Sequence, residues 1–97
     1  MMTLGENCKV VDTCIQNGKG ECHIKHLTDK AAMYDNARMF AHVTIPAGCS
    51  IGDHPHNGEE KTVHAGDICA TGYGEVHGIE NVGSEDLEMI ALIVLEK

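Results

Sequence analysis

Apolar and polar residues alternate over short stretches of this chain, and each stretch ends at a turn signal. A period of two places successive side chains on opposite faces of a β-strand, whereas a helix needs apolar residues three and four positions apart. Helical spacing is scarce, and eleven glycines are spread between the apolar runs. The sequence therefore predicts an all-β chain of short strands and tight turns. The clearest strand is 38–45, which would carry on one face Met39, Ala41, Val43 and Ile45.

The same strand pattern recurs along the whole chain. It predicts strands at 9–15, 21–27, 38–45, 67–70, 76–81 and 87–95. Between the second and third strands, Thr28 and Asp29 predict the cap of a single helical turn that reaches Met33. The final stretch is apolar almost throughout, which predicts burial on both faces, either inside a barrel or against a partner chain.

Size and charge limit the classes of partner. With 97 residues, the chain is expected to form one small domain that spans residues 1–97. Fifteen acidic residues against seven basic ones give a net charge of −8. This charge argues against a nucleic acid or an anionic membrane as partner, and it is typical of a solvated acidic surface.

The cysteines indicate the compartment. Five cysteines are present without any CxxC pair, and the first residues have neither the basic start nor the apolar stretch of a secretion signal. We therefore expect five free thiols in a reducing cytoplasm. Two of them, Cys49 and Cys69, are expected to be buried as small apolar residues.

The chemistry-bearing residues gather in and after the stretch GCSIGDHPHNGEE, residues 48–60. His54 and His56 are two apart, so on a strand both rings would point to the same side. Glu59 and Glu60 follow closely, and His77 could come from a later strand. Three imidazole nitrogens and one carboxylate oxygen form a ligand set that suits one divalent ion, such as Zn, Ni, Fe or Mn.

The spacing in this stretch resembles the first motif of the cupin family. Gly48 is followed after five residues by His54, Pro55 and His56, and after three more by Glu60. The second cupin motif is resembled by GDICATGYGEVHGIEN, residues 66–81, through Gly66, Gly72, Tyr73, Gly74, His77 and Asn81. Its only mismatch is Gly72, where the family usually has proline. The resemblance covers most of the chain after Gly18.

This resemblance implies a jelly-roll cupin β-barrel that binds one divalent metal ion through His54, His56, Glu60 and His77. It also implies a small-molecule ligand and activities such as those of metal-dependent oxygenases, isomerases or decarboxylases. A non-catalytic binding or sensor protein is the alternative, and so is a truncated variant with an impaired metal site. Arg38 is the only arginine, and the sequence contains no local cluster of basic residues that would indicate a phosphate or multi-carboxylate substrate.

The two motifs are unusually close together. Only five residues separate Glu60 from Gly66, where cupins have two strands and a hairpin. Residues 57–67 resemble the far end of that hairpin. Glu60 is therefore either the metal ligand of the first motif or a residue of the later strand. If Glu60 is not the ligand, Glu59 is the other candidate. A shortened barrel exposes strand edges, which predicts a homodimer formed by simple pairing or by strand exchange.

The remaining polar residues have weaker indications. His42 would bind substrate if its face of strand 38–45 lines the barrel, and Tyr73 could reach the same ligand from its turn. Asp53 could orient a metal-bound histidine, although a turn aspartate is the simpler interpretation. Asn81 is expected to be a turn residue. The other histidines, His23, His26 and His64, are expected to be solvated strand side chains.

Overall fold

The computed structural model describes residues 2–52, 61–72 and 78–95. A 3-10 turn, η1 (Gly5–Asn7), precedes six strands: β1 (Val10–Thr13), β2 (Cys22–His26), β3 (Ala37–Ile45), β4 (Ser50–Ile51), β5 (Ile79–Glu80) and β6 (Leu87–Val94). This element list confirms the all-β prediction. Over the described ranges, no helix has the length and hydrophobicity needed to cross a membrane.

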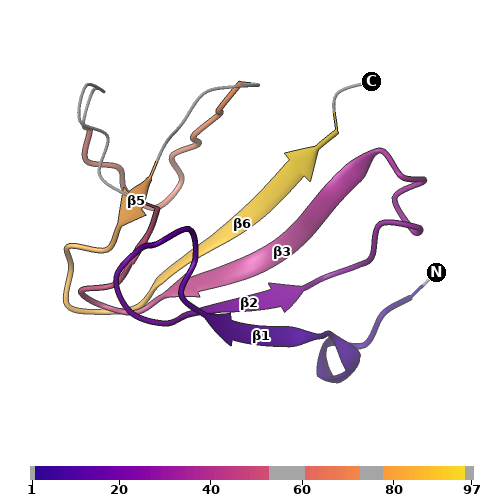
Figure 1. Ribbon diagram of the computed structural model, residues 1–97, viewed down its shortest axis with the longest axis horizontal. Helices are drawn as coiled ribbons and strands as arrows, with labels where there is room; N and C mark the ends of the chain where they lie inside the picture. The colour runs from indigo at the N-terminus through magenta and orange to yellow at the C-terminus, as the bar shows by residue number, and fades with distance from the viewer. Residues whose placement is uncertain (1, 53–60, 73–77, 96–97) are drawn as a thin grey trace.

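The strands form two antiparallel sheets. Four of them lie side by side in the order β1-β2-β3-β6, as Figure 1 shows, and the remaining two form the small sheet β4-β5. The predicted strands 9–15, 21–27, 38–45 and 87–95 correspond to the four members of the large sheet. Strand β4 was not predicted, and the described strands do not close into a barrel.

One face of the large sheet forms the core. Its centre consists of Cys22, Ala41, Val43 and Ile45, each 0–2% exposed. Burial raises the pKa of the Cys22 thiol, which is therefore held in its neutral form. We call this side the core face, and the alternation predicted for 38–45 is confirmed on it. The opposite side, here called the outer face, carries His23, Lys25, Phe40, His42, Thr44, Glu88, Ile90 and Leu92.

Strand β6 is not buried on both sides. Its residues alternate between half-buried and exposed, and Ile90, Leu92 and Val94 are 58–67% exposed. The reason is that no described segment packs over the side of β6 on which these three residues lie. Burial within one chain is therefore a wrong prediction for this strand, and burial against a partner chain stays a prediction.

The segment 61–72 is exposed throughout and contains no strand, so the strand predicted at 67–70 is wrong. A turn forms where the Asp67 carboxylate accepts the His64 N–H at 2.7 Å. Beyond this turn, Ile68 is 91% exposed, and no described strand lies alongside to supply ladder hydrogen bonds. Cys69 is exposed as well, which corrects its predicted burial, although all five thiols are free as expected.

The connection between β2 and β3 is a series of turns. The Asp29 carboxylate accepts the Ala32 N–H at 2.7 Å, which is the capping contact that the sequence predicted. The turns do not become a helix, because Tyr34 and Asp35 take left-handed φ values of 54° and 56°.

Strand β4 is held from both sides. Along one edge it pairs with β5, and along the other the Ser50 N–H donates to the Lys19 carbonyl at 2.9 Å. The Ser50 Oγ accepts the Lys19 N–H, also at 2.9 Å. Glycine is required at Gly18, because a Cβ there would collide with the Ser50 carbonyl. The loop 15–20 therefore stabilises this short strand along the edge that does not pair with β5.

Asn81 joins the two sheets. Its side-chain amide donates to the carbonyl of Ile45 at the end of β3 at 2.8 Å and to that of Glu85 before β6 at 2.7 Å. Its Oδ1 accepts the Gly83 N–H at 3.0 Å. Its backbone pairs with the segment before β4 through Gly48 and Cys49. The residue is only 7% exposed, so the predicted turn residue is in fact a buried connector of four segments.

The substitution Asn81→Ala should destabilise the fold strongly. It leaves the Ile45 and Glu85 carbonyls without their donor, and each lost buried partner costs about 1–3 kcal/mol. We expect the free energy of unfolding in urea to fall by roughly 2–4 kcal/mol. The matched control is Asn36→Ala, which removes an exposed amide. Equal stability of the two variants would contradict this role of Asn81.

Candidate functional site

The small sheet brings the two motif segments together. Ser50 lies opposite Glu80 and Ile51 opposite Ile79 in an antiparallel register. The chain thus enters the segment 53–60 from β4 and returns from 73–77 into β5 at neighbouring points of one sheet. This contact links residues about thirty positions apart in sequence. It is the described geometry that bears most directly on the predicted metal site.

The predicted ligands themselves lie outside the described residues. This holds for His54, His56, Glu60 and His77, for the substrate-binding candidate Tyr73, and for Asp53 and Glu59. Their assignment stays a prediction. What the structure describes is the pair of strands that flank these segments in the sequence, β4 and β5, together with the connector Asn81.

His42 lies on the outer face of β3. Its backbone neighbours across the sheet are Lys25 and Ile90, and its Nε2 is 3.5 Å from a carboxylate oxygen of Glu88. Binding of substrate was expected if this face lined the barrel interior. The residues that line the wide hollow of the molecule include Met39 and Val43 from the core face but not His42. Its predicted role in substrate binding stays a prediction.

A different set of potential metal ligands is close together in the described residues. One ligand atom each from Asp12, Glu21 and His23 lies within 4.8 Å of the others. No local sequence pattern indicates this triad, because it arises from the β1–β2 register, which places Asp12 opposite His23. The His23 Nδ1 is 2.7 Å from the Asp12 Oδ1, and both side chains are about half exposed. This hydrogen bond explains the arrangement without a metal ion.

The acidic residues of the triad change the pKa of His23. The hydrogen bond to Asp12 is the largest effect and raises the pKa of the imidazole. Desolvation opposes it, and the negative charges of Asp12, Glu21 and Asp86 add to the increase. His23 is half-buried on a polar face, as expected from the sequence. The triad is therefore best described as an exposed aspartate–histidine pair with an acidic neighbour.

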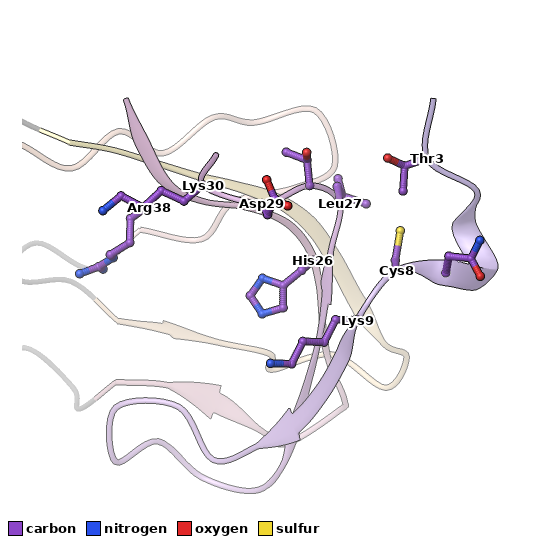
Figure 2. A pocket seen from close by; sticks show the side chains of 10 residues that line it. Thr3, Cys8, Lys9, His26, Leu27, Asp29, Lys30 and Arg38 are labelled. Carbon is purple, nitrogen blue, oxygen red and sulfur yellow. The ribbon is translucent and has the colours of Figure 1, made fainter. Parts of the chain in front are cut away.

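Two hollows flank the large sheet. The wide one is bordered by residues of the core face, by outer-face residues of the edge strand β6 such as Ile90 and Leu92, and by segments 61–72 and 78–83, so it adjoins the ends of both motif segments. A smaller one of about 450 Å³ lies at the start of β3 beside the N-terminal segment (Figure 2). His26 and Arg38 border both hollows.

Comparison with known proteins identifies the family. No family model matches the chain. A Thermotoga maritima protein named oxalate-binding protein is 39% identical over 99 residues, covering 84% of this chain and 82% of that protein. The chain belongs to the family of this oxalate-binding protein. A crystal structure from the same organism, described as a predicted oxalate decarboxylase, matches with a TM-score of 0.89 and 35% identity. That match covers 99% of this chain and 100% of the other.

The alignment within the oxalate-binding protein family also bears on the closeness of the two motifs. Its 99 positions exceed the 97 residues of this chain, of which only 84% are included. The aligned region therefore contains residues of the relative that have no counterpart here. This agrees with the sequence-based interpretation that a piece of the fold is absent from this chain.

The aspartate–histidine pair should be visible in a titration. We expect the His23 pKa, measured by NMR, to lie above the ordinary value of 6.5 and to fall in Asp12→Asn. The control Glu21→Gln should lower it less, because it removes a charge but not the hydrogen bond. Since the folded-state pKa is raised, the pair stabilises the fold fully below pH 6.5 and loses this effect as the pH rises through the raised pKa. An unchanged pKa in Asp12→Asn would refute this.

Proposed function

We propose that the chain is a small cupin that binds a small carboxylic acid at a divalent metal ion. The metal ligands in this proposal are His54, His56, Glu60 and His77, with Glu59 as the alternative carboxylate. The observation that carries the proposal is the pairing of β4 with β5, which supports a common location for the two histidine-bearing segments. The name of the 39% identical relative supports oxalate, or an acid close to it, as the ligand.

The ligand set suits Zn, Ni, Fe or Mn, and it would leave positions open for a ligand with two oxygen atoms. A bound metal ion would supply a concentrated positive charge, and a doubly charged carboxylate ligand can coordinate to it. The protein would contribute a largely apolar wall, since Ile24, Met39 and Val43 line the wide hollow beside β4 and β5.

A second candidate function is catalysis. The structural neighbour is described as a predicted oxalate decarboxylase, a reaction in which a C–C bond breaks, carbon dioxide leaves and a proton forms the C–H bond of formate. An oxygenase or isomerase reaction is the other possibility that the cupin resemblance implies. We favour binding, because the described strands leave the hollow open and an open site weakens electrostatic catalysis. Formate release from oxalate would decide for the decarboxylase.

We also propose that the protein works as a homodimer. The exposed apolar row of Ile90, Leu92 and Val94 on the edge strand is the surface that a second copy would cover. The five free thiols fit the proposed cytoplasmic location.

Metal content tests the proposed site. Protein prepared without a histidine tag should contain about one divalent ion per chain. The double substitution His54→Ala/His56→Ala should lower metal affinity by more than about 100-fold, because losing a residue that only hydrogen-bonds to a metal ligand already lowers it about 10–100-fold. Oxalate affinity, measured by calorimetry, should fall in parallel. The matched control is His64→Ala, which removes an exposed histidine nearby in sequence. Unchanged metal content in the double variant would exclude the assigned ligands.

Light scattering after size-exclusion chromatography tests the dimer. We expect the mass of two chains for the unmodified protein and of one chain for Leu92→Lys, because a charge on the apolar row would have to be desolvated in the interface. Val10→Lys is the control, since Val10 is 56% exposed, close to the 58% of Leu92, but lies on the opposite edge strand. A monomeric unmodified protein would rule the dimer out.

A further inference from the structure

The smaller hollow has a charge opposite to that of the whole protein. The chain has fifteen acidic and seven basic residues. Three of those seven basic residues, Lys9, Lys30 and Arg38, line the hollow of about 450 Å³, together with His26 and a single acidic residue, Asp29. In Figure 2, the side chains of Lys30 and Arg38 extend in the same direction. The hollow is thus a local concentration of positive charge on an acidic protein.

These cations are not used for ion pairs in the part of the chain that the structure describes. The ion pairs of His23 with Asp12 and of His42 with Glu88 do not involve the hollow. The one acidic group of the hollow, Asp29, already accepts the Ala32 N–H with its Oδ1. Nothing in the described packing explains why three cations gather here.

The position of the cations is set by the sheet. The His26 N–H donates to the Lys9 carbonyl at 2.8 Å, and the Leu27 N–H donates to the Phe40 carbonyl at 3.0 Å. The first bond fixes the chain before β1 against the end of β2, and the second fixes the start of β3 there, two residues after Arg38. The connection that carries Lys30 begins at the same place. Residues far apart in sequence thereby reach one hollow.

We propose that this hollow binds a small multivalent oxyanion at a site separate from the proposed metal centre. The guanidinium of Arg38 can donate two parallel hydrogen bonds to a carboxylate or a phosphate, and the two lysines supply point charges. The volume of about 450 Å³ lies within the range of small-molecule sites, about 300–1,000 Å³, and is larger than a single inorganic ion requires. A metabolite-sized polycarboxylate or phosphorylated compound shares the required chemistry.

The expected affinity is weak and salt-dependent, because the lysines and Arg38 are exposed. Each exposed charge pair changes an equilibrium by about two- to fivefold. The substitutions Lys9→Ala, Lys30→Ala and Arg38→Ala should each weaken anion binding by about this factor, and the triple variant should abolish measurable binding. Lys19→Ala is the matched control, since it removes one exposed positive charge outside the hollow.

The test is an NMR titration of the full chain, supplemented with diamagnetic Zn²⁺, with citrate and with inorganic phosphate. Saturable shifts of the amides at 26–30 and 38, absent in sodium chloride of equal ionic strength, are expected for at least one of the two anions. Saturation by citrate alone indicates a polycarboxylate ligand, and saturation by phosphate indicates a phosphorylated one. Shifts that do not saturate, or equal weakening by Lys19→Ala, would overturn the proposal.

Repeating the titration in His54→Ala/His56→Ala separates this site from the proposed function. The shifts at 26–30 and 38 should persist in that variant, because no cation of the hollow belongs to the proposed ligand set. If these shifts persist while metal is lost, both assignments stand. If they vanish together with the metal, the separate anion site is wrong, whatever the fate of the metal centre.

Discussion

The buried amide of Asn81 is the interaction on which the described structure depends. It is the residue where the small sheet, the end of β3 and the approach to β6 meet, and its three side-chain hydrogen bonds satisfy groups from Ile45, Gly83 and Glu85. A buried polar side chain is stabilising only when its donors and acceptors are all paired, and this one meets that condition. The amide therefore fixes β5 relative to the core, and β5 in turn fixes β4.

The sequence predicted those parts of the fold in which local pattern and final environment agree. In β3, alternation placed Ala41, Val43 and Ile45 on one face, and that face became the core. The prediction was wrong for strands whose burial or pairing depends on residues far away in the sequence. The apolar pattern of β6 indicated burial on two sides, but a strand is buried on two sides only if something covers each of them. Strand β4 has only two residues, and its partners are distant in sequence.

The same distinction separates the predictable from the unpredictable parts of the candidate site. His54 and His56 were recognisable because a spacing of two is a local property of the sequence. The triad around His23 and the cationic hollow around Arg38 have no such spacing, since the antiparallel registers bring their members together. The sequence accordingly shows no local basic cluster, although three cations line one hollow in the structure.

The short distance between the two motifs has different effects on two properties of the proposed metal site. These are the strand pairing beside the motif segments and the shielding of the site from water. The pairing that supports the motif segments uses residues 48–51 and 79–81, and these lie outside the stretch between Glu60 and Gly66 where the family resemblance indicates a loss. Shortening that stretch therefore leaves the connector Asn81 and both short strands in place. A lost hairpin would instead remove shielding from water. Segment 61–72, which borders the wide hollow, is exposed throughout. Metal coordination would require only that the proposed ligands are held in place, whereas acceleration of a reaction requires a site closed to water. A shortened member of this family would thus keep binding more readily than catalysis, unless a second copy closes the hollow.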